Sequence, residues 1–259
     1  MTDTWDSTLR RRYRCQRVAR PIRTDGSLSD PLWRDLPWTD DFVDITGDAA
    51  LRPRFRTRAR MAWDDTYFYI AAELEEPHVW GTITEKNAVM FEDNDFEVFI
   101  DPDGDGLDYY EFEINALGSI WELHLPRPYA DGGVPNLGCN IDGLRSSVRV
   151  DGTINDPSDE DRGWRVEIAI PWAGLGTYHK EGACPPRPGD VWRVNFSRVQ
   201  WRHEIVDGRY VRIPPHGTPI AESLNPEEQD HPEDNWVWSP QGAVNMHLPL
   251  RWGDVEFVD

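Results

Sequence analysis

The sequence is poor in long apolar runs and in cysteine. No stretch of its 259 residues approaches the roughly 20 consecutive apolar residues of a membrane span, and the N-terminus MTDTWDSTLRRRYRCQ lacks the apolar centre of a secretory signal. The three cysteines, Cys15, Cys139 and Cys184, stand far apart and show no CxxC or Cys/His ligand spacing. We therefore expect no membrane segment, no disulfide framework and no zinc site, and, for the chain as given, a cytoplasmic location.

Basic residues are also scarce. The chain carries 27 Lys and Arg against 47 Asp and Glu, a formal net charge of −20. Nucleic acid and anionic membranes bind basic surfaces, so this balance argues against both as partners. The chain has no GxSxG elbow, P-loop, GxGxxG after a strand or HExxH, and these absences remove most support for the corresponding enzyme classes.

What the sequence has in abundance is tryptophan, with 13 residues, and period-two alternation of apolar and polar side chains. Alternation predicts strands, and Pro, Gly and Asp clusters between the segments predict turns. The predicted strands cover 54–63, 67–74, 95–101, 109–115, 119–125, 144–150, 164–170, 191–199 and 255–258. We predict an all-β fold, an antiparallel two-sheet β-sandwich of the jelly-roll or immunoglobulin-like type.

One domain is expected over residues 21–259, because no internal repeat or linker divides the chain. Residues 1–20 read as a basic N-terminal arm. Residues 214–235 read as a long polar loop, and a loop of that length is usually functional or disordered.

The segment EDNDFEVFIDPDGDG, 92–106, begins a predicted hairpin with a polar side. Period two places Glu97 on the first strand, and Glu111, Glu113 and Asn115 on the second, on the face away from the core. Together with aromatic rings, these groups suit the hydroxyls and the apolar face of a sugar. The same pattern also fits a solvated outer face of the sheet.

The turn of this hairpin carries three carboxylates at alternate positions, Asp101, Asp103 and Asp105, followed by Gly106. This spacing lets them converge on a hard cation such as calcium. An EF-hand would require a Glu where Phe112 stands, and helices where strands are predicted. An acidic hairpin loop without a metal is the alternative.

Several blocks in order resemble the family 9 carbohydrate-binding modules, in particular their free-standing bacterial relatives. The blocks are DGSLSDPLWRDLPW (25–38), ARMAWDDTYFYIAAEL (59–74), DNDFEVFIDPDGDG (93–106), YYEFEINALGSIWEL (109–123), GWRVEIAIPW (163–172), WRVNFSRVQW (192–201) and NWVWSPQGAVNMHLPLRWGDVEF (235–257). The resemblance implies a β-sandwich, stabilised by calcium in known members and often extracellular, that holds sugars between two aromatic rings, often at a chain end.

Positions carried over from this resemblance give a candidate site. The family's strand Glu falls on Glu97 and its first clamp ring on Phe91, while its R-V-N triplet becomes Glu113-Ile114-Asn115, with an acid in place of the Arg. The second ring is expected in Asn235–Trp238, with Trp236 preferred over Trp238. The predicted ligand residues are Phe91, Glu97, Glu113, Asn115, Arg198, Trp236 and Trp238.

The predicted function is non-catalytic binding of a monosaccharide, an oligosaccharide or a polysaccharide end. The alternative is an enzyme acting on a glycoside or small metabolite, with Glu97 and Glu113 as acid and base, since neighbouring strands can give the carboxyl spacing of a retaining glycosidase. A domain whose aromatic residues contact a protein partner is a third possibility.

Overall fold

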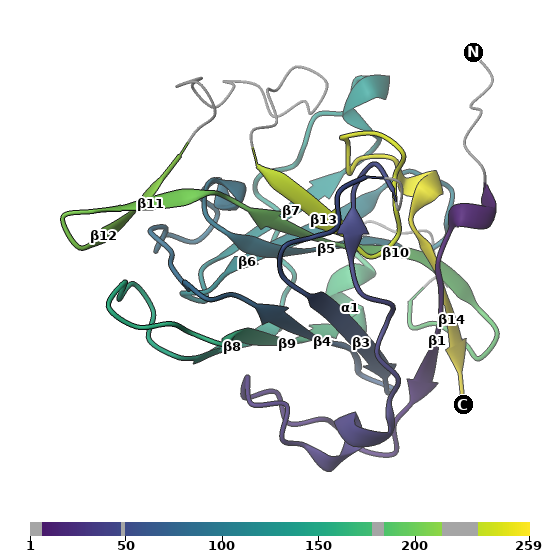
Figure 1. Ribbon diagram of the computed structural model, residues 1–259. Helices are drawn as coiled ribbons and strands as arrows, with labels where there is room; N and C mark the ends of the chain where they lie inside the picture. Colours follow the sequence, from purple (N-terminus) through teal and green to yellow (C-terminus); the bar gives the residue numbers. More distant parts are fainter. Residues whose placement is uncertain (1–6, 48–49, 178–183, 214–232) are drawn as a thin grey trace.

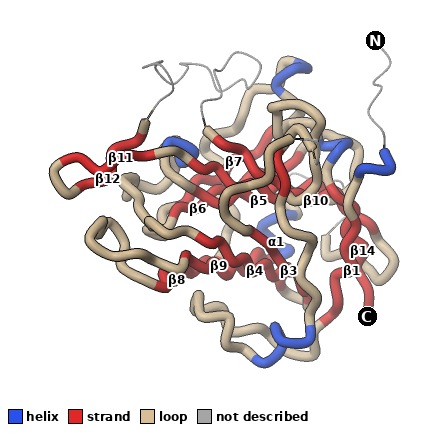
Figure 2. Tube along the Cα trace, viewed as in Figure 1, coloured by secondary structure: helices blue, strands red, loops and turns tan. Residues whose placement is uncertain are grey.

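The computed structural model describes residues 7–47, 50–177, 184–213 and 233–259. Strands dominate these residues, and the one α-helix among them, α1 (Trp172–Leu175), is a single turn (Figures 1 and 2). Within the described part of the chain, no helix is long and apolar enough to cross a membrane. The prediction of an all-β fold is confirmed.

The strands are β1 (Arg12–Arg17), β2 (Val43–Asp44), β3 (Thr57–Trp63), β4 (Tyr67–Glu75), β5 (Asp95–Asp101), β6 (Tyr109–Asn115), β7 (Ile120–Leu125), β8 (Arg145–Asp151), β9 (Gly163–Pro171), β10 (Val191–Gln200), β11 (His203–Val206), β12 (Arg209–Arg212), β13 (Asp234–Val237) and β14 (Gly253–Val258). All nine predicted strands occur, each within three residues of its predicted ends. Short strands β1, β2 and β11–β13 were not predicted.

Hydrogen bonding joins the strands differently from the prediction. Twelve of them form one sheet along the path β7-β6-β5-β10-β14-β1-β3-β4-β9-β8, with β13 and β2 branching from β10, while β11 and β12 form a separate pair. Strand β1 runs parallel to both β14 and β3. The expectation of purely antiparallel pairing is therefore wrong: β1 connects both halves into one mixed sheet.

The sheet curls so that its two halves face each other, which is visible in Figure 1 as the layers β5–β6–β7–β10 and β3–β4–β8–β9. The main core lies between them. Phe96, Val98 and Phe112 contribute from one half, Met61 and Ile70 from the other. Period-two alternation is the cause, because every second side chain of each strand points inward.

The segment expected as a basic arm, residues 1–20, instead contributes a strand to the sheet. In β1, Tyr13 and Cys15 are buried in the main core. The arginines that alternate with them, Arg12 and Arg14, are exposed and form ion pairs with the neighbouring strand β14. The basic character of this segment is thus the outer face of a strand. The predicted loop 214–235 lies outside the described residues except at 233–235, where β13 begins.

The outer face of the β5–β6–β7 half is also covered. A second apolar cluster contains Phe99 and Tyr109 from the strands, Met90 from the 3₁₀ turn η3 (Met90–Glu92), and Met246 and Trp252 from the segment before β14. Polar side chains that alternation directs to this outer face consequently lie under protein and not in bulk water. This covering is what creates the site described next.

Candidate functional site

A cavity opens on the outer face of β5, β6 and β7, between η3 and the segment that precedes β14. Its space, including the open mouth, is about 580 Å³. The lining residues are Ile45, Phe91, Glu97, Phe99, Glu111, Glu113, Trp121, Leu123, Tyr129, Val199, Glu233, Asn235, Val244, Asn245, Met246 and His247. No lysine or arginine is among them.

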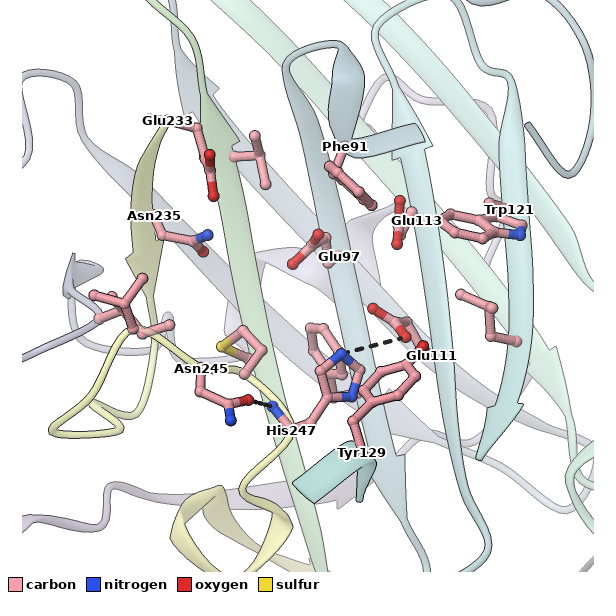
Figure 3. Close-up of a pocket in the computed structure, with 16 residues that line it drawn as sticks. Phe91, Glu97, Glu111, Glu113, Trp121, Tyr129, Glu233, Asn235, Asn245 and His247 are labelled. Atoms are coloured by element: carbon pink, nitrogen blue, oxygen red, sulfur yellow. Dashed lines mark hydrogen bonds and ion pairs between the residues drawn. The ribbon is translucent and has the colours of Figure 1, made fainter. Parts of the chain in front are cut away.

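A row of glutamates forms the floor of this cavity. Glu97 of β5 lies directly opposite Glu113 of β6, and Glu111 follows on the same face of β6 (Figure 3). Strand alternation places Asp95 on that face as well, and one carboxylate oxygen each of Asp95, Glu97 and Glu113 lies within 4.8 Å of the others. Three acidic groups, Asp95, Glu97 and Glu113, therefore converge on this face, and Glu111 continues the row toward His247.

These carboxyls are hard to ionise because they are buried. Burial raises the pKa of Glu97 to about 7, against which a hydrogen bond from Ser197 acts. Burial, with repulsion from Glu97, raises the pKa values of Asp95, Glu111 and Glu113 well above the ordinary range. Asp95 Oδ2 and Glu113 Oε2 have no hydrogen-bond partner among the described residues. At neutral pH the floor therefore holds protons, or its charge needs a cationic partner.

The opposite end of the cavity is built around His247. Its Nδ1 lies 2.9 Å from the Tyr109 hydroxyl, its Nε2 lies 4.0 Å from Glu111, and its backbone N–H donates to Asn245 Oδ1. The Tyr129 ring packs edge-on against the imidazole, with centroids 4.6 Å apart. Burial lowers the pKa of His247 to about 3, so the imidazole is neutral at physiological pH.

Aromatic rings stand on both sides of the glutamate row. Figure 3 shows Phe91 of η3 at one end, beyond Glu97, and Tyr129 of the 3₁₀ turn η4 (Tyr129–Asp131) at the other, beyond Glu111. Trp121 of β7, whose centroid is 6.2 Å from that of Phe91, closes the side behind Glu113. Apolar ring faces and polar oxygens thus alternate around one cavity.

Of the predicted ligand residues, the structure brings Phe91, Glu97 and Glu113 together at this cavity. Asn115 shares their side of the sheet but is fully buried below them. Its amide donates to Asp93 Oδ2 and to the Ile83 carbonyl, and its Oδ1 accepts from the backbone of Leu117. Asn115 therefore holds a turn and does not line the cavity.

Trp236 and Trp238, expected as the second clamp ring, lie on the other side of the sheet. Both are buried in the main core, with 3% and 1% of their surface exposed. Alternation along β13 turns Asn235 and Val237 toward the cavity side instead, and Asn235 lines the cavity, where it accepts a hydrogen bond from Ser197. Neither tryptophan lines the cavity, and the aromatic ring at the end opposite Phe91 is that of Tyr129 (Figure 3).

Arg198, another predicted ligand residue, also points into the interior. Its guanidinium is fully buried and forms an ion pair with Glu76 at 2.6 Å. It also donates to Gln200 Oε1 and Thr57 Oγ1, and lies 5.2 Å from the centre of the Trp236 ring. Arg198 is therefore a buried structural cation packed beneath β10 and β13.

The three aspartates of the predicted calcium turn do converge. One carboxylate oxygen each of Asp101, Asp103 and Asp105 lies within 4.8 Å of the others. Asp101 is buried and accepts hydrogen bonds from the backbone N–H groups of Gly104 and Gly106, both at 2.9 Å. Burial raises the pKa of Asp101 to about 7. Hydrogen bonds to the Asp101 carboxylate therefore hold the backbone of this turn.

Other cavity residues were not among the predicted ligand residues. Alternation places Glu111 on the polar face with Glu97 and Glu113, and the same alternation could have found Trp121, which lies opposite Glu113 on β7. Tyr129, Asn245 and His247 come from turns without periodicity, and no local signal marks them.

A cavity of aromatic rings and hydrogen-bonding side chains on the outer face of a sheet has the composition of a small-molecule binding site. The family described as "Carbohydrate family 9 binding domain-like" matches residues 24–184, more than half of the chain. The chain belongs to this family.

Individual proteins agree with this assignment. The chain is 25% identical over 153 residues, 58% of its length, to exoglucanase XynX of Acetivibrio thermocellus, but the match spans only 12% of that protein. In fold it is similar to a candidate carbohydrate-binding protein from Bacteroides uniformis (TM-score 0.61, 17% identity, 96% of this chain and 99% of the other). It is also similar to a family 9 carbohydrate-binding module from Caldicellulosiruptor kristjanssonii in complex with cellotriose (TM-score 0.53, 15% identity, 96% and 94%).

Proposed function

We propose that the cavity between Phe91 and Tyr129 is the carbohydrate site of this non-catalytic binding domain. The observation that carries this assignment is the placement of the two rings at opposite ends of a row of hydrogen-bonding carboxyls (Figure 3). Ring faces cover the C–H surfaces of a pyranose, while Glu97 and Asn235 exchange hydrogen bonds with its hydroxyls. Protonated carboxyls donate as well as accept, which suits hydroxyl groups.

The ligand class we propose is the end of a glucose-containing chain. The Caldicellulosiruptor module was solved with cellotriose and with glucose, and a protein that accepts both has a site that one sugar ring can fill. The cavity here is walled by η3 on one side and by the segment before β14 on the other, so it is a pocket for a terminal unit and not an open groove.

The geometry does not favour the alternative of a glycoside-processing enzyme. In such enzymes the acid and its partner carboxylate flank the scissile bond. Glu97 and Glu113 project from adjacent strands toward the same side, so a sugar lies above both and not between them. The raised pKa values follow from burial and crowding, which need no catalytic role.

For the turn Asp101–Asp105 we propose calcium binding. The convergence of three carboxylate oxygens within 4.8 Å suits a hard cation, and backbone donors orient Asp101. Calcium should raise the melting temperature of the wild type, and EDTA should reverse the rise. In Asp103→Asn/Asp105→Asn, the part of the calcium-dependent rise in melting temperature that this turn supplies should be lost. A rise as large as that of the wild type would contradict the proposal.

Isothermal titration with glucose, cellotriose and an unrelated disaccharide such as sucrose tests the sugar assignment. We expect one site per chain for glucose and cellotriose, and a dissociation constant raised by about tenfold or more in Phe91→Ala. Absence of binding to every sugar of a broader mono- and oligosaccharide panel by the folded wild type would refute it.

A further inference from the structure

The carboxyl cluster on the cavity floor is not explained by sugar binding alone. Asp95, Glu97 and Glu113 are 0%, 5% and 1% exposed, and each offers one oxygen within 4.8 Å of the other two. A sugar hydroxyl needs one or two such acceptors. Three buried carboxyls packed this closely repel one another when ionised, and burial removes the water that would screen them.

Two atoms of this cluster identify where a partner is missing. Asp95 Oδ2 and Glu113 Oε2 are buried and have no hydrogen-bond partner among the described residues, and both side chains belong to the group whose oxygens converge with that of Glu97. Buried acceptors are normally paired, because an unpaired one costs about 1–3 kcal/mol. Because one oxygen each of Asp95, Glu97 and Glu113 lies within 4.8 Å of the others, one partner placed among them would contact all three side chains.

Among the described residues that line the cavity, none supplies positive charge to the cluster. The sixteen lining residues include no lysine or arginine, and His247 is held neutral by burial. Arg198, which neighbours Val199 on β10, faces the interior and is paired with Glu76. A cation from solution is the partner that fits the charge.

We propose that Asp95, Glu97 and Glu113 bind a divalent cation of the calcium class at the floor of the cavity, and that this cation ligates hydroxyls of the bound sugar. Hard cations take six to eight oxygen ligands at 2.3–2.6 Å, and oxygens around one such ion lie within about 5 Å of each other. Three carboxyls occupy part of such a shell and leave positions toward the cavity. Vicinal sugar hydroxyls can fill them.

This inference rests on the proposed function only in its second half. The cation site depends on the three carboxyls, while the bridge to the sugar also depends on the ring-lined cavity above them. Cation binding and sugar binding are consequently measured separately, so that failure of one can be told from failure of the other.

The first measurement is calcium titration without sugar, in the Asp103→Asn/Asp105→Asn background so that the acidic turn does not contribute. We expect one calcium site, with terbium luminescence sensitised by Trp121, which lies opposite Glu113 in the β6–β7 register. Adding Glu113→Gln should lower the affinity for calcium by about tenfold or more, since one charged ligand is lost. Adding Glu122→Gln, a buried glutamate of β7 outside the cavity, should leave the affinity unchanged.

The second measurement is glucose titration in the same background with calcium or with EDTA. We expect affinity to fall at least severalfold in EDTA for the parent, and to be insensitive to EDTA in Glu113→Gln. If the parent binds no calcium and no terbium, the carboxyls share protons only and the cation proposal is overturned, whatever the sugar result. Calcium binding with no glucose binding at all would instead refute the sugar site.

Discussion

Glu97 and Glu113 lie directly opposite each other on β5 and β6, with 5% and 1% of their surfaces exposed. Like charges in this cross-strand relationship destabilise a sheet. The strands tolerate the pair because the covering segment before β14 and η3 builds a cavity over it, in which raised pKa values keep part of the cluster protonated. The acidic face is thus kept at a cost in stability, which is typical of a binding site.

Replacing Glu113 by Gln should therefore stabilise the protein when no cation is present. The amide removes one acid, and its N–H₂ group can donate to the neighbouring carboxyls of Asp95 and Glu111. We expect the free energy of unfolding at pH 8 in EDTA to rise by about 1–3 kcal/mol, the usual cost of an unsatisfied buried acceptor. Urea unfolding followed by tryptophan fluorescence measures this. A loss of stability would show that Glu113 makes a stabilising contact that the structure lacks.

The two walls of the cavity should contribute to sugar affinity separately. Phe91→Ala and Tyr129→Ala each remove a ring face. We expect each to lower the affinity for glucose by about tenfold or more, equivalent to about 1.4 kcal/mol of binding free energy. Tyr67→Ala is the matched control, because Tyr67 is a half-buried ring of β4 outside the cavity, packed against Arg145. Equal losses in all three variants would mean that stability and not contact is being measured.

Strand alternation determines how much of this site can be predicted from the sequence. Period two correctly placed Glu97 and Glu113 on one face, because Phe96, Val98 and Phe112 between and opposite them are unambiguously apolar. In Asn235–Trp238 the same period separates the tryptophans from Asn235, but both faces of β13 contact apolar clusters. The sequence therefore could not decide that the indoles turn inward.

Residues of the irregular segments could not be predicted at all. The segment 239–252 brings His247 to the cavity. This segment folds back over β5 and packs Met246 and Trp252 against Phe99. Such a path depends on tertiary packing and leaves no periodic signal. Strand β1 was missed for a related reason, since the arginines of RYRCQR suggested a solvated arm while only Tyr13 and Cys15 face the core.

Arg198 should prove to be a stability residue. Removing its guanidinium in Arg198→Met leaves the Glu76 carboxylate buried without its charge partner, and breaking such a pair costs about 3–5 kcal/mol. Arg56→Met is the matched control. It removes the exposed ion pair with Glu75 and should change stability by less than about 1 kcal/mol. Similar effects of both variants in urea unfolding would contradict the buried pair.

His247 should make the protein less stable in acid. Its pKa is about 3 in the folded state against an ordinary 6.5, so between these values the unfolded chain binds the additional proton. Stability from this group is complete above pH 6.5 and falls as pH decreases, by about 1.4 kcal/mol per unit. The buried acids of the cavity change stability with pH in the opposite direction. The contribution of His247 is therefore measured by comparing variants.

In His247→Gln the loss of stability between pH 6.5 and pH 4 should be smaller than in the wild type, because the titrating group is gone. His78→Gln serves as control, since His78 is only partly buried and outside the cavity. Thermal melts across this pH range provide the comparison. A wild-type slope retained in His247→Gln would show that the imidazole is already accessible to protons in the folded protein.

A crystal structure of the protein soaked with glucose and calcium tests the central claim most directly. The account predicts one pyranose ring between Phe91 and Tyr129, with hydroxyls within hydrogen-bonding distance of Glu97 and Asn235. A sugar bound elsewhere on the molecule, with this cavity empty in the same crystal, would contradict it.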